Sequence, residues 1–114
     1  MTTGKKNLEE YLQEIGRAEL LTIDEERELV KAVQAKGGDC DEMKRLEKAN
    51  ARFIVSVANQ YQNQGLSLEE LIEAGEEGLR KAAMKYKLDY DFKFIAYAVW
   101  WIRQAIIQAI EEKK

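Results

Sequence analysis

Two short motifs of the form Ser/Thr-x-x-Glu constrain the fold of this chain more than any other feature. One runs from Thr22 to Glu25, and the other runs from Ser67 to Glu70. In such a capping box the hydroxyl and the carboxylate each accept a hydrogen bond from the other residue's backbone N–H, which fixes the first turn of a helix. Apolar residues spaced three or four apart follow both motifs, as on the buried face of a helix. The motifs therefore predict helices that begin just after residues 22 and 67.

Composition extends this prediction to the whole chain. The 114 residues contain no proline, and long stretches consist of the helix formers Glu, Lys, Ala, Leu and Gln. No run of alternating polarity is long enough to predict a sheet. We expect an all-α fold, a compact bundle of about five helices in a single domain with a loose N-terminus at residues 1–6. The expected helices cover about residues 8–15, 23–36, 39–63, 68–86 and 92 to the end.

Glycines mark the ends of these elements and also occupy two positions inside one of them. Gly37 and Gly38 stop the second helix, and "NQG" at residues 63–65 breaks the third. Gly75 and Gly78 fall inside the fourth helix, where each costs up to about 1 kcal/mol relative to alanine. That cost suggests a close approach of another helix, or a bend.

Charge and reactive residues exclude several classes of protein. The net charge is −3, so a nucleic-acid role requires a local basic surface rather than a basic chain. A single cysteine, Cys40, excludes an internal disulfide, and with no histidine a metal centre is not expected. We interpret Cys40 as an inert loop thiol. Without a convincing nucleophile or a phosphate-binding loop, we expect neither an enzyme, nor a cofactor, nor a small-molecule substrate.

No long apolar span occurs in the chain, so we expect no membrane partner and a cytoplasmic location.

The stretch "FKFIAYAVWWIRQAI" at residues 92–106 contains the only two tryptophans, Trp100 and Trp101. On a helix they point about 100° apart, so both cannot face the centre of one core. A core stripe is predicted at Phe94, Ala98, Trp101, Ile102, Ala105, Ile106 and Ala109. A second stripe, largely off the core, is predicted at Lys93, Tyr97, Trp100, Gln104 and Gln108. Such a surface suits stacking on unpaired bases, while the alternatives are cover by another helix or a protein interface.

Charge is unevenly distributed beside this helix. Residues 80–93 are locally basic, whereas residues 69–77 carry five glutamates and no base. Crowded carboxylates of this kind usually form a solvated helix face. A docking site for a basic partner is the functional alternative, and it makes the chain a helical protein-interaction module.

Three segments together resemble bacterial primary sigma factors, the promoter-specificity subunits of RNA polymerase. They are "YLQEIGRAELLTIDEERELVKAV", "ANARFIVSVANQYQNQGLSLEELI" and "FKFIAYAVWWIRQAI". The resemblance covers about Leu8 to Ile110, with residues 7–36 similar to the end of region one and residues 39–112 similar to region two. The "NQYQNQGLSL" segment looks like primary sigma factors of the Bacteroidetes type.

This resemblance implies a binding protein with an all-helical, region-two type of fold and two functional faces. One face binds the minus-ten promoter element as single-stranded, non-template DNA. It stacks aromatic rings on the strand and captures flipped bases. The other face docks on a coiled coil of the polymerase β′ subunit. The family's DNA-binding positions fall on Asn50, Arg52, Tyr86, Phe92, Lys93, Phe94, Tyr97, Trp100, Trp101, Arg103 and Gln104. Its polymerase-binding positions fall on Glu70, Glu73, Glu76 and Arg80.

Individual roles follow from the same resemblance. Trp100 and Trp101 match the pair that forms a wedge at the upstream edge of the DNA bubble, and Gln104 matches a glutamine associated with the first base pair of the element. Lys93 and Arg103 match contacts to the DNA backbone. Asn50 and Arg52 match positions that reach the non-template strand, and Tyr86 stands near the flipped adenine.

Some positions differ from the family pattern. Hydrogen-bonding residues of the DNA face are replaced by apolar ones at Ile95, Ala96, Val99 and Ile107. The loop before the last helix has Lys87, Tyr90 and Asp91 where the family has an acidic residue, an arginine and a glycine. Since the replacements favour burial and helix propensity, we interpret the chain as an engineered or strongly diverged domain on a sigma scaffold. The alternative function is therefore a structural scaffold whose DNA and polymerase binding is weakened or lost.

Overall fold

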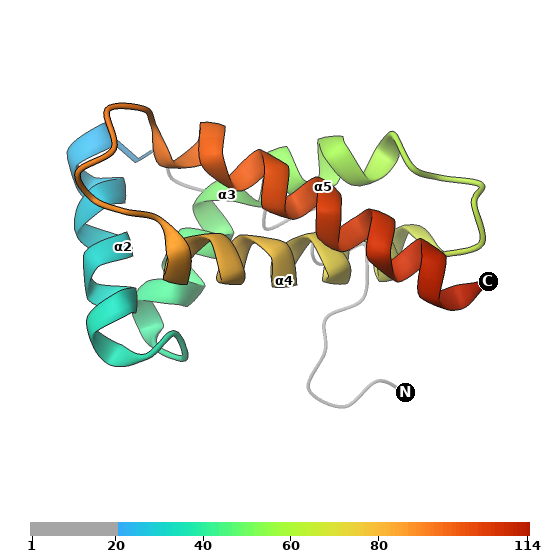
Figure 1. The fold of residues 1–114 in the computed structure, drawn as a ribbon, viewed down its shortest axis with the longest axis horizontal. Coiled ribbons are helices and arrows are strands. Elements are labelled where there is room, and N and C mark those ends of the chain that lie inside the picture. The colour runs from blue at the N-terminus through green and yellow to red at the C-terminus, as the bar shows by residue number, and fades with distance from the viewer. Residues whose placement is uncertain (1–20) are drawn as a thin grey trace.

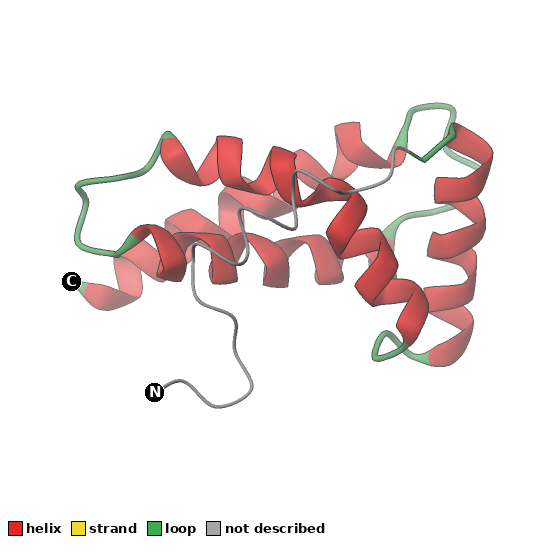
Figure 2. Ribbon diagram, turned by 180° about the vertical axis from the view of Figure 1, so that it is seen from behind, coloured by secondary structure: helices red, strands yellow, loops and turns green. Residues whose placement is uncertain are grey.

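The computed structural model describes residues 21–114, so the helix expected at residues 8–15 and the loose start at residues 1–6 lie outside it. Residues 21–114 form helices joined by loops and contain no strand, which confirms the all-α prediction (Figure 2). The helices are α2 (Ile23–Lys36), α3 (Asp41–Asn59), α4 (Leu68–Lys85) and α5 (Phe94–Lys113).

Both predicted capping boxes are present. The Thr22 hydroxyl accepts from the Glu25 N–H at 3.1 Å, and the Glu25 carboxylate accepts from the Thr22 N–H at 2.9 Å. Ser67 and Glu70 repeat the arrangement at the start of α4 with the same two distances. Gly37 ends α2 in the left-handed conformation at φ 85°, which an L side chain rarely adopts. The sequence signals for these helix ends were therefore correct.

The predicted end of α3 was wrong by four residues. The prediction placed it at residue 63, whereas the helix ends at Asn59. The Gln60 N–H bonds to the carbonyl of Val57 at 3.0 Å, three residues back rather than four, so the last turn tightens and stops. Asn63 then adopts φ 69° and redirects the chain. α5 likewise begins two residues later than expected, at Phe94.

Helices α4 and α5 run side by side along the molecule, with α3 against them and α2 across one end (Figure 1). Gly78 of α4 meets the backbone of α5, because a Cβ atom built on it would lie 2.6 Å from the Trp101 carbonyl oxygen and 2.8 Å from the Ile102 Cα. A Cβ on Gly75 would lie 2.9 Å from a methyl of Ile54. The glycines therefore permit close helix approach, one of the two alternatives that the sequence left open.

Each of the helices within residues 21–114 contributes to a continuous core. Its fully buried members include Val30, Val33, Leu46, Ile54, Leu71, Leu79, Ile102 and Ile106. The loop between α4 and α5 lies at the same end as α2, and the loop between α3 and α4 lies at the opposite end (Figure 1). Within residues 21–114 no helix is long and apolar enough to cross a membrane.

Candidate nucleic-acid interface

A cluster of aromatic rings surrounds Tyr86, the residue that caps the C-terminus of α4. Tyr86 is only 2% exposed, and its ring makes edge contacts at centroid distances of 5.4 Å with both Tyr90 and Phe94. The Tyr86 hydroxyl donates a hydrogen bond to the backbone carbonyl of Phe92. Burial raises the pKa of this hydroxyl above its ordinary value, so it stays protonated and available as a donor. Tyr86 therefore fixes the loop that follows α4.

The rings around Tyr86 continue onto the surface. Tyr90 stacks on Phe92, with centroids 4.6 Å apart and planes at 21°, and Phe92 is 43% exposed. The ring centroid of Tyr97 on α5 lies 6.2 Å from that of Trp101. Trp101 in turn makes an edge contact with Trp100, with centroids 5.3 Å apart. The result is a chain of rings from the α4–α5 loop along α5.

The two tryptophans differ in solvent exposure, as their assignment to two different stripes predicted. Trp101 is half-buried and packs against the core, whereas Trp100 is 57% exposed. The other members of the second stripe are also off the core, because Lys93, Gln104 and Gln108 are exposed and Tyr97 is half-buried. The stripe is therefore a surface of large rings interleaved with amides and one lysine.

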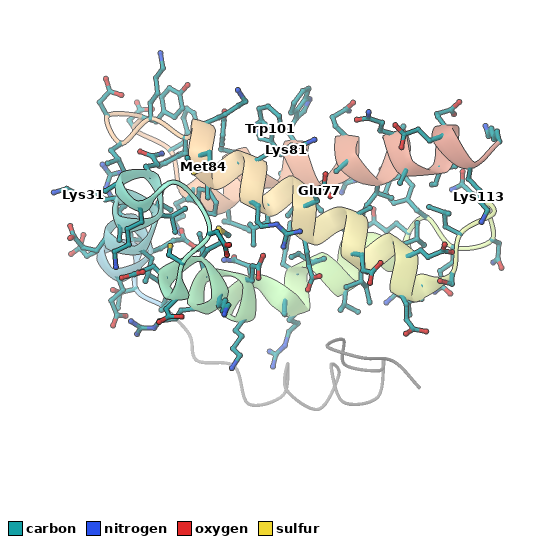
Figure 3. The ribbon with its side chains drawn as sticks, turned by 90° about the horizontal axis from the view of Figure 1, so that it is seen from below. Lys31, Glu77, Lys81, Met84, Trp101 and Lys113 are labelled. Atoms are coloured by element: carbon teal, nitrogen blue, oxygen red, sulfur yellow. The ribbon has the colours of Figure 1, made fainter. Side chains whose placement is uncertain are left out.

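Cations lie beside these rings. The Nζ of Lys85 on α4 lies 6.0 Å from the centroid of the Trp101 ring, at the outer limit for a cation–π interaction. Figure 3 shows Lys81, one turn earlier on α4, on the same side as Trp101. Lys93 is exposed before α5, and Arg103 is half-buried within it. The basic segment predicted at residues 80–93 thus borders the ring surface, although the chain as a whole is acidic.

Helix α2 holds the loop that carries Phe92. This contact was not predicted from the sequence. Gln34 donates from Nε2 to the carbonyls of Ala83 at 2.8 Å and Tyr86 at 2.6 Å, at the end of α4. Arg27 donates to the carbonyl of Leu88 inside the loop. Polar residues on the inward edge of α2 were the available signal, since Gln34 stands four residues after the buried Val30.

Glu26 adds a charged group to this junction. Burial raises the pKa of the Glu26 carboxyl, and the Lys93 ammonium partly opposes that shift. An acid of α2 therefore lies near the start of α5, next to the loop that carries the aromatic rings.

Three predicted DNA-binding residues do not reach the surface. Asn50 is 8% exposed, and its Nδ2 donates to the Leu46 carbonyl of its own helix at 2.9 Å. Phe94 is 1% exposed and belongs to the core, and Tyr86 is the buried centre of the cluster. In this conformation all three side chains are buried. The core stripe predicted the burial of Phe94 from its spacing, whereas the burial of Asn50 and Tyr86 depends on how the helices pack.

Arg52 is exposed but is not brought to the rings. It lies two residues before Ile54, so it points about 200° around α3 from the face that packs beneath Gly75 of α4. The structure thus gathers Phe92, Lys93, Tyr97 and the segment from Trp100 to Gln104, and leaves Arg52 on another face.

The residues predicted to meet the polymerase follow one exposed side of α4. Glu73 is exposed and Glu76 is half-buried. Glu70 is engaged in the capping box, and the backbone hydrogen bond from Ser67 lowers the pKa of its carboxyl. Arg80 bonds Glu47 of α3 at 2.5 Å, so its guanidinium connects two helices. This side is acidic, as predicted, and Glu70 and Arg80 are held by the contacts just described.

Residues 21–114 contain no group of three or more His, Cys, Asp or Glu side chains that could hold a metal ion. Cys40 is a free, half-buried thiol at the start of α3.

Comparison with known proteins identifies the chain's relatives. Residues 46–114, more than half of the chain, match Sigma-70 region 2, and residues 8–37 match Sigma-70 factor, region 1.2. The RNA polymerase sigma factor SigA of Listeria monocytogenes is 48% identical over 103 residues, which cover 90% of this chain and 27% of that protein. SigA of a Bacillus species is 46% identical over 103 residues, with the same coverage of both chains. SigA of Lactococcus lactis is 44% identical over 104 residues and is covered to 29%.

The chain thus spans somewhat more than a quarter of the length of the curated relatives it matches. Sigma factors are transcription initiation factors and not enzymes, which agrees with the expectation from the sequence. On the strength of these matches, the chain belongs to the sigma-70 family and contains its region 1.2 and region 2.

Proposed function

We propose that this sigma-factor domain acts in transcription initiation by binding the minus-ten promoter element as non-template single-stranded DNA. The observation that carries the proposal is Trp100, a 57% exposed indole held edge-on against Trp101. Stacking of a base on an aromatic ring is worth about 1–3 kcal/mol. An exposed ring with a fixed partner loses little conformational entropy when a base stacks on it. Trp100 is therefore the principal stacking platform.

Polar and charged side chains near Trp100 supply the other contacts that a single strand needs. Gln104, one turn after Trp100, offers an amide whose donor and acceptor match the N6 and N7 groups of adenine. Lys85 and Lys93 lie beside the rings and supply charge for phosphates, as does Arg103. Phe92 extends the surface on the loop side. These groups assign stacking, base-edge and backbone contacts to one face of the molecule.

The experiment is a fluorescence anisotropy titration of a labelled single strand that carries TATAAT. We expect Trp100→Ala to weaken binding about 5- to 150-fold, the factor that corresponds to losing one stacked base. Gln64→Ala, an exposed change in the loop at the far end of the molecule, is the matched control and leaves binding unchanged. Binding also weakens as salt rises, because phosphate contacts release counterions. Equal affinity of wild type and Trp100→Ala would refute the platform.

We also propose that the acidic side of α4 docks on the β′ coiled coil of RNA polymerase core. Glu73 and Glu76 provide negative charge for a basic partner, with the exposed Glu69 and Glu77 beside them. Charge reversal by Glu73→Lys should reduce retention on an immobilised β′ coiled coil. Glu111→Lys, at the exposed end of α5, is the control. Full retention of Glu73→Lys at low salt would contradict this contact.

The organisation expected from the sequence belongs to the same proposal. We place residues 7–36 and 39–112 in a single domain that works in the cytoplasm. The Bacteroidetes likeness remains a proposal about origin.

A second candidate function, a diverged or engineered sigma scaffold with weakened binding, is favoured by specific contacts. Ile95 and Val99 are half-buried and pack against the core, where the family has hydrogen-bonding residues. The ion pair between Arg80 and Glu47 ties α4 to α3 on the proposed polymerase face. Such contacts stabilise a fold without serving a ligand. Under this function, Trp100→Ala and wild type both fail to bind the TATAAT strand.

A further inference from the structure

The ring of Tyr90 contacts three other aromatic rings, those of Tyr86, Phe92 and Tyr97. Its ring centroid lies 4.6 Å from that of Phe92, on which it stacks, 5.7 Å from that of Tyr97 and 5.4 Å from that of Tyr86. These three neighbours are themselves only 5.6 to 6.3 Å from one another. Tyr90 therefore covers the face of the Phe92 ring on which it stacks, and a base can stack on that face only if Tyr90 leaves it.

Of the three tyrosine rings in this cluster, Tyr90 is the one whose hydroxyl is not anchored by a residue of the described part of the chain. The Tyr86 hydroxyl is anchored on the Phe92 carbonyl, and the Tyr97 hydroxyl lies 3.5 Å from the Lys85 carbonyl. Within the described part of the chain, the Tyr90 hydroxyl forms no hydrogen bond and its ring is held by ring contacts alone. Tyr90 is also half-buried, so its ring has a direct route to solvent.

The loop backbone is fixed on both sides of this ring. Arg27 donates to the Leu88 carbonyl, and the Tyr90 N–H bonds the Lys87 carbonyl at 3.0 Å. The Phe92 carbonyl accepts from Tyr86. A rotation of the Tyr90 side chain is therefore enough to move its ring, and the loop need not unfold. Phe92 and Tyr97 stay in place to receive a ligand.

We propose that Tyr90 closes a base-binding recess whose walls are Phe92 and Tyr97 and whose floor is Tyr86. The ligand is a single unpaired DNA base, and the inference rests on the proposed single-strand binding. A ring stacked at 4.6 Å and 21° stands in for a base, since both are flat π systems that stack with similar spacing. Tyr90 and the base exchange places, so the chain's own tyrosine competes with the DNA.

The competition has a measurable size. An aromatic pair contributes an interaction that corresponds to a factor of about 2 to 12 in an equilibrium constant. The base must break this interaction before it can stack on Phe92. Removing the ring by Tyr90→Ala should therefore raise the affinity for single-stranded DNA about 2- to 12-fold. A residue that merely helped to form the surface would change affinity in the opposite direction.

The test is the anisotropy titration with the TATAAT strand, applied to wild type, Tyr90→Ala and Tyr90→Phe. Tyr90→Phe is the matched control, because it keeps the ring and removes only a hydroxyl that has no hydrogen-bond partner among residues 21–114. It should bind like wild type, whereas Tyr90→Ala binds more tightly. Tyr90→Ser provides a second ring-free variant, should the alanine variant fail to fold. Strands with one abasic site at each position locate the recess, because the gain disappears at a single position.

The outcomes separate this inference from the proposed function. If wild type binds and both ring-free variants bind equally well or less well, the closure by Tyr90 is wrong and the Trp100 platform stands. If Tyr90→Phe binds as tightly as Tyr90→Ala, the ring is not the obstacle and the inference is again overturned. If wild type and all variants fail to bind the strand, the proposed function fails and the recess fails with it.

Discussion

Gly78 provides the sharpest test of the packing that presents α5. In Gly78→Ala the new Cβ would lie 2.6 Å from the Trp101 carbonyl oxygen, whereas ordinary contact begins at 3.4 Å. The obstacle is backbone, which no change of rotamer relieves, so α4 and α5 must separate by about 0.8 Å. Overpacking of this kind costs about 1–3 kcal/mol, and backbone contact argues for the upper end. Alanine recovers up to about 1 kcal/mol of helix propensity.

The expected net loss is about 2 kcal/mol, or a fall of about 8 °C in Tm for a domain of this size. Gly75→Ala is the matched control on the same helix. Its Cβ would meet the Cγ2 methyl of the buried Ile54 at 2.9 Å, so a side chain and not the backbone must shift. We therefore expect Gly75→Ala to cost less than Gly78→Ala, about 1 kcal/mol.

Thermal and urea denaturation followed by circular dichroism at the helical band measure both variants. The close approach predicts the order wild type, Gly75→Ala, Gly78→Ala from most to least stable, with the two glycine variants clearly separated. If Gly78→Ala is as stable as Gly75→Ala, the backbone contact between α4 and α5 is not as tight as described.

Three further predictions concern the ends of the helices. Gln34→Ala leaves two carbonyls at the end of α4 without their donor and should cost about 1–3 kcal/mol in urea denaturation, whereas an unchanged midpoint would show that solvent replaces it. Burial raises the pKa of the Glu26 carboxyl, so the folded state binds this proton more tightly than the unfolded state. The resulting stabilisation is present below the unfolded pKa near 4.5 and is lost as the pH rises through the folded pKa. Glu26→Gln should therefore stabilise the protein at pH 7 and lose that advantage below pH 4.5, and a constant difference across this range would contradict the assignment. Ser67→Ala removes one half of a capping box and should cost about 0.5–2 kcal/mol of unfolding free energy, and an unchanged Tm would show that the cap contributes nothing.

The helix ends that the sequence predicted correctly are those fixed by a capping box or by a glycine. Thr22 and Ser67 fixed two helix starts because a capping box satisfies backbone donors within four residues. Gly37 fixed an end because its left-handed conformation is a local property. The end of α3 at Asn59 was missed because no residue there forbids a helix, and the tightened turn depends on the loop that follows.

The face of α5 was predictable because periodicity alone separates Trp100 from Trp101. The predicted stripes placed Trp101 on the core side and Trp100 off it, and Trp101 is half-buried whereas Trp100 is exposed. Burial of Asn50 and Tyr86 was not predictable, since it depends on which helices cover them. The ring contacts of Tyr90 depend on how a loop folds back onto α5, and a periodic pattern carries no such information.

The central claim is that this face of α5, with its adjoining loop, recognises the minus-ten element as a single strand. The most direct measurement compares the affinities of wild type for three DNAs at one fixed salt concentration: the TATAAT single strand, a scrambled strand of equal composition and the TATAAT duplex. We predict that the TATAAT strand binds most tightly, by at least about tenfold over the scrambled strand, since one discriminated base is worth about 1–3 kcal/mol. Equal affinity for all three DNAs, or no binding to any of them, would contradict the account.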